Sequence, residues 1–179
     1  DQMLIEIADN PNLGSLAGLS APGDNEITSL TLESLPALKS LAGLEGLREA
    51  NDINLGLCDG LVDFTGLGGL RRADSLQVND CRGMTSLKGL DALEQVPGAL
   101  QLSSTPALAS LQGAPRLNEI GYLLITGTGL PTLEGMSALT KLRQVMLDQN
   151  PTLQNLRGLE KVTQLEGIHI DSNAVLKTL

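Results

Sequence analysis

The chain has 179 residues, a net charge of −9 and a pI near 4.5; leucine supplies 38 positions and aromatics only 1%. The acidity argues against a nucleic-acid partner, because phosphate binding needs clustered Lys and Arg. No apolar run approaches the roughly 18 residues of a transmembrane helix, so no direct membrane insertion is expected. One His and two Cys leave little material for chemistry, so we expect no cofactor, no metal and no enzyme activity.

Pairs of apolar residues two positions apart recur along the whole chain about every 23 residues. In chain order they are Ile5/Ile7, Leu30/Leu32, Ile53/Leu55, Leu76/Val78, Leu100/Leu102, Leu123/Ile125, Val145/Leu147 and Ile168/Ile170. Each pair predicts a short strand with one buried face. A unit this small cannot bury that face alone, so the units must stack and share one core. We therefore predict about eight short parallel strands in one sheet, in a single solenoid domain over 1–179 with seven to eight repeats.

Two further marks follow each strand in the same period. One is an apolar pair three apart, as in Leu87 after Met84, and the other is a Gly followed by an apolar residue, as in Gly89-Leu90. Spacing of three suits a turn of helix or 3₁₀-helix on the return side, which predicts an α/β solenoid. Residues 20–26 carry a two-residue excess and predict a bulging loop. Because the first and last units are incomplete, we expect a longer parent chain or end-to-end self-association.

The stretch Leu142-x-x-Val145-x-Leu147-x-x-Asn150 resembles the core pattern of the leucine-rich-repeat superfamily. The resemblance implies a right-handed solenoid with an inward polar side chain, rung after rung, that satisfies backbone groups at the turn. We call the residues at this position the ladder. They are Asn10, Leu35, Cys58, Cys81, Thr105, Thr128, Asn150 and Asn173, and Leu35 alone departs from the pattern.

A particular variant is suggested by the segments that flank the strands. Two residues usually separate the ladder residue from the next Leu, as in Asn150-Pro151-Thr152-Leu153, and an extra residue precedes the strand in Val96-Pro97-Gly98-Ala99-Leu100. These features are similar to the receptor L-domain, a ligand-binding solenoid of receptor ectodomains and microbial surface proteins. The resemblance implies an extracellular or cell-surface location and a bacterial source.

Cys58 and Cys81 occupy the ladder in adjacent units. Stacking would bring their Cα atoms to about 5 Å, which is within disulfide range. Two buried free thiols are the alternative, and they are slightly favoured because side chains in a ladder run side by side.

The residues between the two apolar positions of each strand point outward and form columns on the sheet face. The face is polar at first and gains Tyr122, Leu124 and Met146 in its last third, beside the three residues Asp148, His169 and Asp171. Exposed apolar side chains on a regular face predict a contact patch for a protein, a peptide or a glycan. Ordinary surface is the alternative.

The three polar residues of this patch also raise the question of chemistry. Their spacing permits a metal, but nothing orients the His and solvated acids are common on sheet faces, so no metal is predicted. A pair of acids could act on sugars, but nothing on an open face would separate their pKa values. We therefore predict a non-catalytic recognition module. A structural spacer within a larger surface protein is the first alternative, and a solenoid carbohydrate-active enzyme the second.

Overall fold

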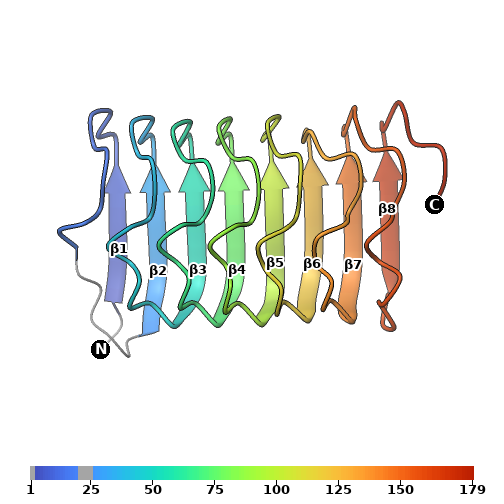
Figure 1. The fold of residues 1–179 in the computed structure, drawn as a ribbon, viewed down its shortest axis with the longest axis horizontal. Helices are drawn as coiled ribbons and strands as arrows, with labels where there is room; N and C mark the ends of the chain where they lie inside the picture. The colour runs from blue at the N-terminus through green and yellow to red at the C-terminus, as the bar shows by residue number, and fades with distance from the viewer. Residues whose placement is uncertain (1–2, 20–25) are drawn as a thin grey trace.

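The computed structural model describes residues 3–19 and 26–179, and it shows one sheet of eight parallel strands in chain order (Figure 1). The strands are β1 (Met3–Ala8), β2 (Glu26–Glu33), β3 (Glu49–Gly56), β4 (Arg72–Asn79), β5 (Gln95–Ser103), β6 (Glu119–Thr126), β7 (Lys141–Asp148) and β8 (Gly167–Asp171). Each strand pairs only with its sequence neighbours, and the chain returns from the end of one strand to the start of the next. The predicted stack of units is confirmed as a parallel β-solenoid.

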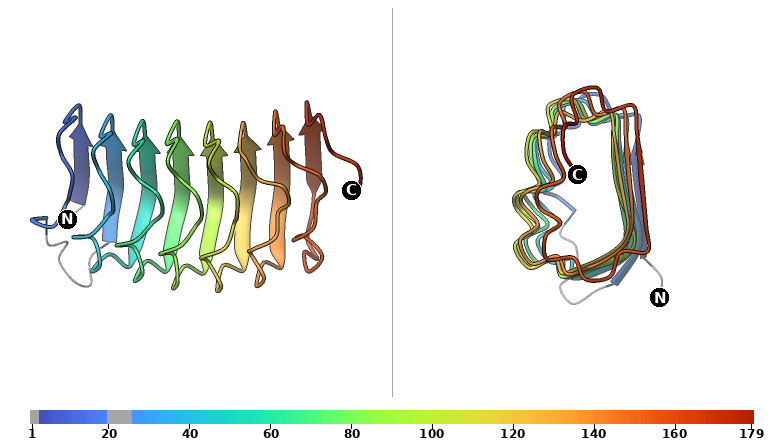
Figure 2. Two further views of the ribbon diagram at one scale, coloured as in Figure 1. Left: turned by 45° about the horizontal axis from the view of Figure 1, so that its top comes forward. Right: turned by 90° about the vertical axis from the view of Figure 1, so that its right-hand side faces the viewer.

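The register follows the sequence period. Leu30 pairs with Ile53, Ile53 with Leu76, and Leu76 with Leu100, so residues one repeat apart are lateral neighbours. Seen along the sheet, the successive turns superimpose, with the strands on one side of the coil and the return segments on the other (Figure 2). The predicted outward columns are therefore present as rows of adjacent side chains.

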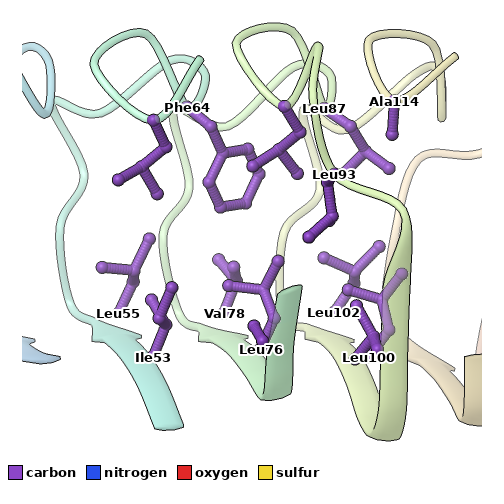
Figure 3. Packing of buried hydrophobic residues seen from close by; sticks show 14 of the residues in the cluster. Ile53, Leu55, Phe64, Leu76, Val78, Leu87, Leu93, Leu100, Leu102 and Ala114 are labelled. Atoms are coloured by element: carbon purple, nitrogen blue, oxygen red, sulfur yellow. The ribbon is translucent and has the colours of Figure 1, made fainter. Parts of the chain in front are cut away.

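The core lies inside this coil and is almost wholly aliphatic. Ile53 and Leu76 from the strands point toward Phe64 and Leu87 from the return segments, and all four side chains are fully buried (Figure 3). Each rung contributes only a few such residues, so the hydrophobic contacts that stabilise it are made largely with the next rung. The core is continuous along the stack.

The return segments correct the α/β prediction. The described residues contain no helix, and so none that could span a bilayer; the fold is all-parallel β. In the return segment between β2 and β3, the Leu44 N–H donates to the Leu41 carbonyl at 3.1 Å, and the Leu47 N–H donates to the Leu44 carbonyl at 3.0 Å. The apolar spacing of three thus comes from consecutive β-turns, which together point every third side chain into the core.

A column of glycines explains why these turns do not continue as a helix. One glycine in each of the six return segments from β2 to β8 has a φ between 97° and 132°, far from the negative φ of a 3₁₀-helix; the set is Gly43, Gly66, Gly89, Gly113, Gly135 and Gly158. A Cβ at Gly89 would overlap the carbonyl group of Phe64 in the rung before. The Gly-apolar mark of the sequence therefore records a close approach of backbones between rungs.

The same backbone geometry recurs at the end of each strand, where the residue before the ladder position adopts the left-handed conformation. Its φ lies between 52° and 64° in all eight rungs, at Asp9, Ser34, Leu57, Asp80, Ser104, Gly127, Gln149 and Ser172. Asn, Asp, Ser and Gly suit this position through local hydrogen bonds or the lack of a Cβ. Leu57 and Gln149 lack these features, and Leu57 is also 48% exposed.

The extra residue predicted before Leu100 lies within β5. The pairing of β5 with β6 shifts register between Val96 and Ala99, which is the mark of a β-bulge. The other predicted insertion, at residues 20–26, falls almost entirely outside the described residues.

Candidate functional site

The ladder joins neighbouring rungs through their main chains. The Thr128 N–H donates to Asn150 Oδ1 at 3.1 Å, and Asn150 Nδ2 donates to the Ile125 carbonyl at 2.9 Å. Asn173 repeats both bonds one rung later, to the Asn150 N–H and the Leu147 carbonyl. Each amide thus bridges a donor and an acceptor that the turn of the previous rung leaves unpaired.

The remaining ladder residues follow this scheme to different degrees. Leu35 is fully buried and can make no side-chain bond, and Asn10 is exposed and bonds the Ala8 carbonyl of its own rung. Thr105 is fully buried, but its hydroxyl has no partner among the described residues. The ladder is therefore strongest at its amide end, in the last three rungs.

Cys58 and Cys81 are both free and both fully buried. The Cys58 N–H donates to Cys81 Sγ at 3.4 Å, and Cys81 Sγ donates to the Leu55 carbonyl at 3.7 Å, so thiols here replace the ladder amides. A hydrogen bond with the Cys58 thiol, together with burial, raises the pKa of the Cys81 thiol. The favoured alternative of two buried thiols is confirmed, and no disulfide joins them.

A second polar column was missed by the sequence analysis. One Ser, Thr, Asp or Asn in each return segment accepts the N–H two residues later, at 2.8 to 3.5 Å. The members of this turn column are Ser15, Ser40, Asp63, Ser86, Ser110, Thr132 and Asn155. Short polar side chains at this spacing make Asx- and ST-turns, and their constant place between the two return apolars was the available signal. The column shapes the turns and has no access to the sheet face.

The predicted contact patch lies where the register requires, on the outer face of β6 to β8. Tyr122 is 39% exposed and Met146 43%, and Leu124 pairs directly with Met146, which pairs with His169. Gln144, Val145, Met146, Gly167, Ile168 and His169 line a shallow depression of about 290 Å³. We call Tyr122, Leu124, Met146 and His169 the apolar patch.

The polar residues beside this patch are neighbours on the outer face of β7 and β8. Asp148 pairs with Asp171 across β7 and β8, and His169 lies on the same strand as Asp171. One carboxylate oxygen of Asp148 is buried with no hydrogen-bond partner among the described residues. No three His, Cys, Asp or Glu side chains gather into a possible metal site within ranges 3–19 and 26–179.

The middle of the same face carries a network of uncharged side chains. Gln101 Nε2 on β5 donates to Asn79 Oδ1 on β4 at 2.9 Å and to Ser103 Oγ at 3.3 Å, and Gln77 Nε2 donates to Ser75 Oγ at 3.1 Å. We call these five residues the amide cluster. From the sequence this region was predicted only to be polar. Its lack of charged residues was the feature that could have singled it out.

Comparisons with family models, with curated proteins and with solved structures gave no significant match. The fold itself places the chain among repeat proteins, as a parallel β-solenoid of about seven turns with a spacing of about 23 residues. Any assignment to a narrower family depends on the residues alone.

Proposed function

We propose that this chain is a non-catalytic recognition module that binds a macromolecular ligand through the outer face of its sheet. The observation that carries this proposal is the apolar patch: Tyr122 and Met146 are exposed on a sheet whose register holds them beside Leu124. Large apolar side chains grouped on a rigid face, with polar residues around them, are typical of binding surfaces. A face presented by paired strands also loses little conformational freedom on binding.

The narrower family we propose is the leucine-rich-repeat superfamily, in a form similar to the receptor L-domain of bacterial surface proteins. The ladder supports it, because Cys and Asn side chains bridge successive turns at Cys81, Asn150 and Asn173. The register shift in β5 supports the L-domain variant. An extracellular or cell-surface location follows from this resemblance and from no other feature.

The test is a binding screen with two defined probes, a displayed random-peptide library and an array of immobilised glycans. We expect the wild-type protein to select ligands from at least one probe, and Tyr122→Ser with Met146→Ser to abolish that selection. Val62→Ser is the matched control, since Val62 is 46% exposed in a return segment, away from the sheet face. Ligand binding that survives the double substitution, or no selection from either probe, would refute the proposal.

A structural spacer or assembly element is the second candidate. It is favoured by Ile168 of β8, which occupies the inward register of Val145 but is 48% exposed, whereas Val145 is buried. The spacer function predicts concentration-dependent association in sedimentation that Ile168→Asp abolishes. Association that persists in this variant would contradict it.

A further inference from the structure

We propose that the ligand of the sheet face is an uncharged glycan, bound by the amide cluster on β4 and β5 together with Tyr122 on β6. This inference rests on the proposed function, because it requires that the sheet face is a binding surface. It adds the chemical class of the ligand and moves the centre of the site from β6–β8 to β4–β6, which are adjacent strands (Figure 1).

The amide cluster has unused hydrogen-bonding capacity. The internal bonds of the amide cluster use the amide nitrogen of Gln101 and the amide oxygen of Asn79. Gln101 Oε1 and Asn79 Nδ2 therefore remain available for a ligand. Gln77 keeps its Oε1 in the same way. A sugar hydroxyl both donates and accepts, and a surface that offers free acceptors beside free donors matches that chemistry.

The amide cluster is also preorganised. Gln101 is held by two bonds and Gln77 by one, and all members of the amide cluster are partly buried among their neighbours. Side chains held in one conformation lose less rotamer entropy when a ligand binds. A solvated polar face has no need of such a network between strands.

The sheet face around the amide cluster is uncharged. The nine outward positions on the upper halves of β4, β5 and β6 carry no charged side chain, although 18% of the chain is charged. They are Ser75, Gln77, Asn79, Ala99, Gln101, Ser103, Tyr122, Leu124 and Thr126. Asp52 on β3 and Asp148 on β7 flank these positions, and the charged residues of β4 and β6 lie at the starts of the strands, where Asp74 pairs with Arg72 and Glu119 with Lys141. An uncharged field between acidic borders favours an uncharged ligand and repels an anionic one.

The single tyrosine lies on β6, the strand next to the amide cluster. Tyr122 pairs with Ala99 on β5, and a side chain that ends at Cβ cannot cover the ring from that side. The open side of Tyr122 therefore faces the strand that carries Gln101. The C–H face of a sugar packs on an aromatic ring while its hydroxyls reach neighbouring polar groups, so an amphipathic ring next to amides provides both halves of such a contact.

The experiment is titration calorimetry with the purified chain and neutral glycans chosen from an array that also displays sulfated and carboxylated glycans. We expect binding of neutral glycans only. Gln101→Glu, which preserves size and adds charge, and Tyr122→Ala should each weaken binding by about tenfold or more. Val62→Ser, on a return segment away from the sheet face, is the matched control and should leave affinity within about twofold, because it removes no hydrogen-bonding partner of the ligand.

The salt dependence of the affinity is a second readout, and a purely structural role of Gln101 would not affect it. Affinity should be constant up to about 0.5 M salt, since an uncharged ligand is not screened. Selective binding of anionic glycans, or neutral binding that Gln101→Glu leaves intact, would overturn the inference. If peptides bind through Tyr122 and no glycan does, the inference fails and the proposed function stands; if neither probe binds, both fail.

Discussion

Substituting Gly89 by alanine tests whether close backbone approach between rungs limits the stability of the solenoid. Gly89 has a φ of 97°, and an added Cβ would overlap the main chain of Phe64 and Thr65 in the preceding rung. No flexible side chain can move aside there, because the obstructing atoms are backbone. One of the two rungs must therefore shift.

The expected loss has two parts. A left-handed backbone with a Cβ costs about 1–2 kcal/mol, and overpacking against fixed atoms costs about 1–3 kcal/mol. We expect Gly89→Ala to lower the free energy of unfolding by about 2–5 kcal/mol. This is a large fraction of the unfolding free energy of a typical domain, which is about 5–15 kcal/mol.

Urea denaturation followed by far-ultraviolet circular dichroism measures this change. Gly68→Ala is the matched control: Gly68 lies outside the positive-φ set, and its nearest neighbour would be Asp91 Oδ2 at 3.9 Å. That variant should be neutral or up to about 1 kcal/mol more stable. Equal unfolding midpoints for the two variants would refute the reasoning about the glycine column.

Three other substitutions or conditions test separate features of the fold. Leu57→Asn should raise the free energy of unfolding by about 0.5–1 kcal/mol, since Asn tolerates the left-handed corner better; a lower urea midpoint would contradict this. Asn150→Leu should lower it by about 2–4 kcal/mol by leaving two buried main-chain groups unpaired, whereas Asn10→Ala, at an exposed site, should change it by less than about 1 kcal/mol; equal losses would argue against the ladder. The pKa of Cys81 is raised on folding, so the unfolded chain loses that proton first and stability should decline as the pH rises above about 8.5; a flat urea midpoint up to pH about 10 would show that the thiol is not buried in solution.

The stacking and its register were predictable because the period appears in every unit. Once Leu76 and Leu100 are known to be equivalent, each outward neighbour follows, and the adjacency of Leu124, Met146 and His169 could be stated before any coordinates. The burial of both cysteines followed from their place in the ladder. Periodicity converts a one-dimensional pattern into lateral contacts, which an ordinary globular sequence does not allow.

The return segments could not be assigned in the same way. A spacing of three is shared by the 3₁₀-helix and by a series of β-turns, and inward leucines such as Leu44 and Leu47 satisfy both. The decisive residue is the glycine in each segment, because it requires a positive φ that interrupts a helix. Its requirement comes from the backbone of the neighbouring rung, which the sequence of one unit does not reveal.

The candidate site was only partly accessible to sequence reasoning. The apolar patch was found because Tyr122 and Met146 are unusual on an outward column. The amide cluster was not singled out, because Gln101 and Asn79 become partners only through their side-chain conformations across β4 and β5. Hydrogen bonds between columns depend on rotamers, and the register alone does not determine them.

Because every strand pairs only with its sequence neighbours, the molecule can in principle be lengthened by inserting whole repeats. Duplicating residues 72–94, which run from the start of β4 to the residue before β5, would add one rung and repeat contacts of kinds already present. The first strand, β1, and the last, β8, would keep their neighbours while the distance between them grew by one strand spacing, about 4.8 Å. A scaffold of adjustable length is thus a direct consequence of this strand order.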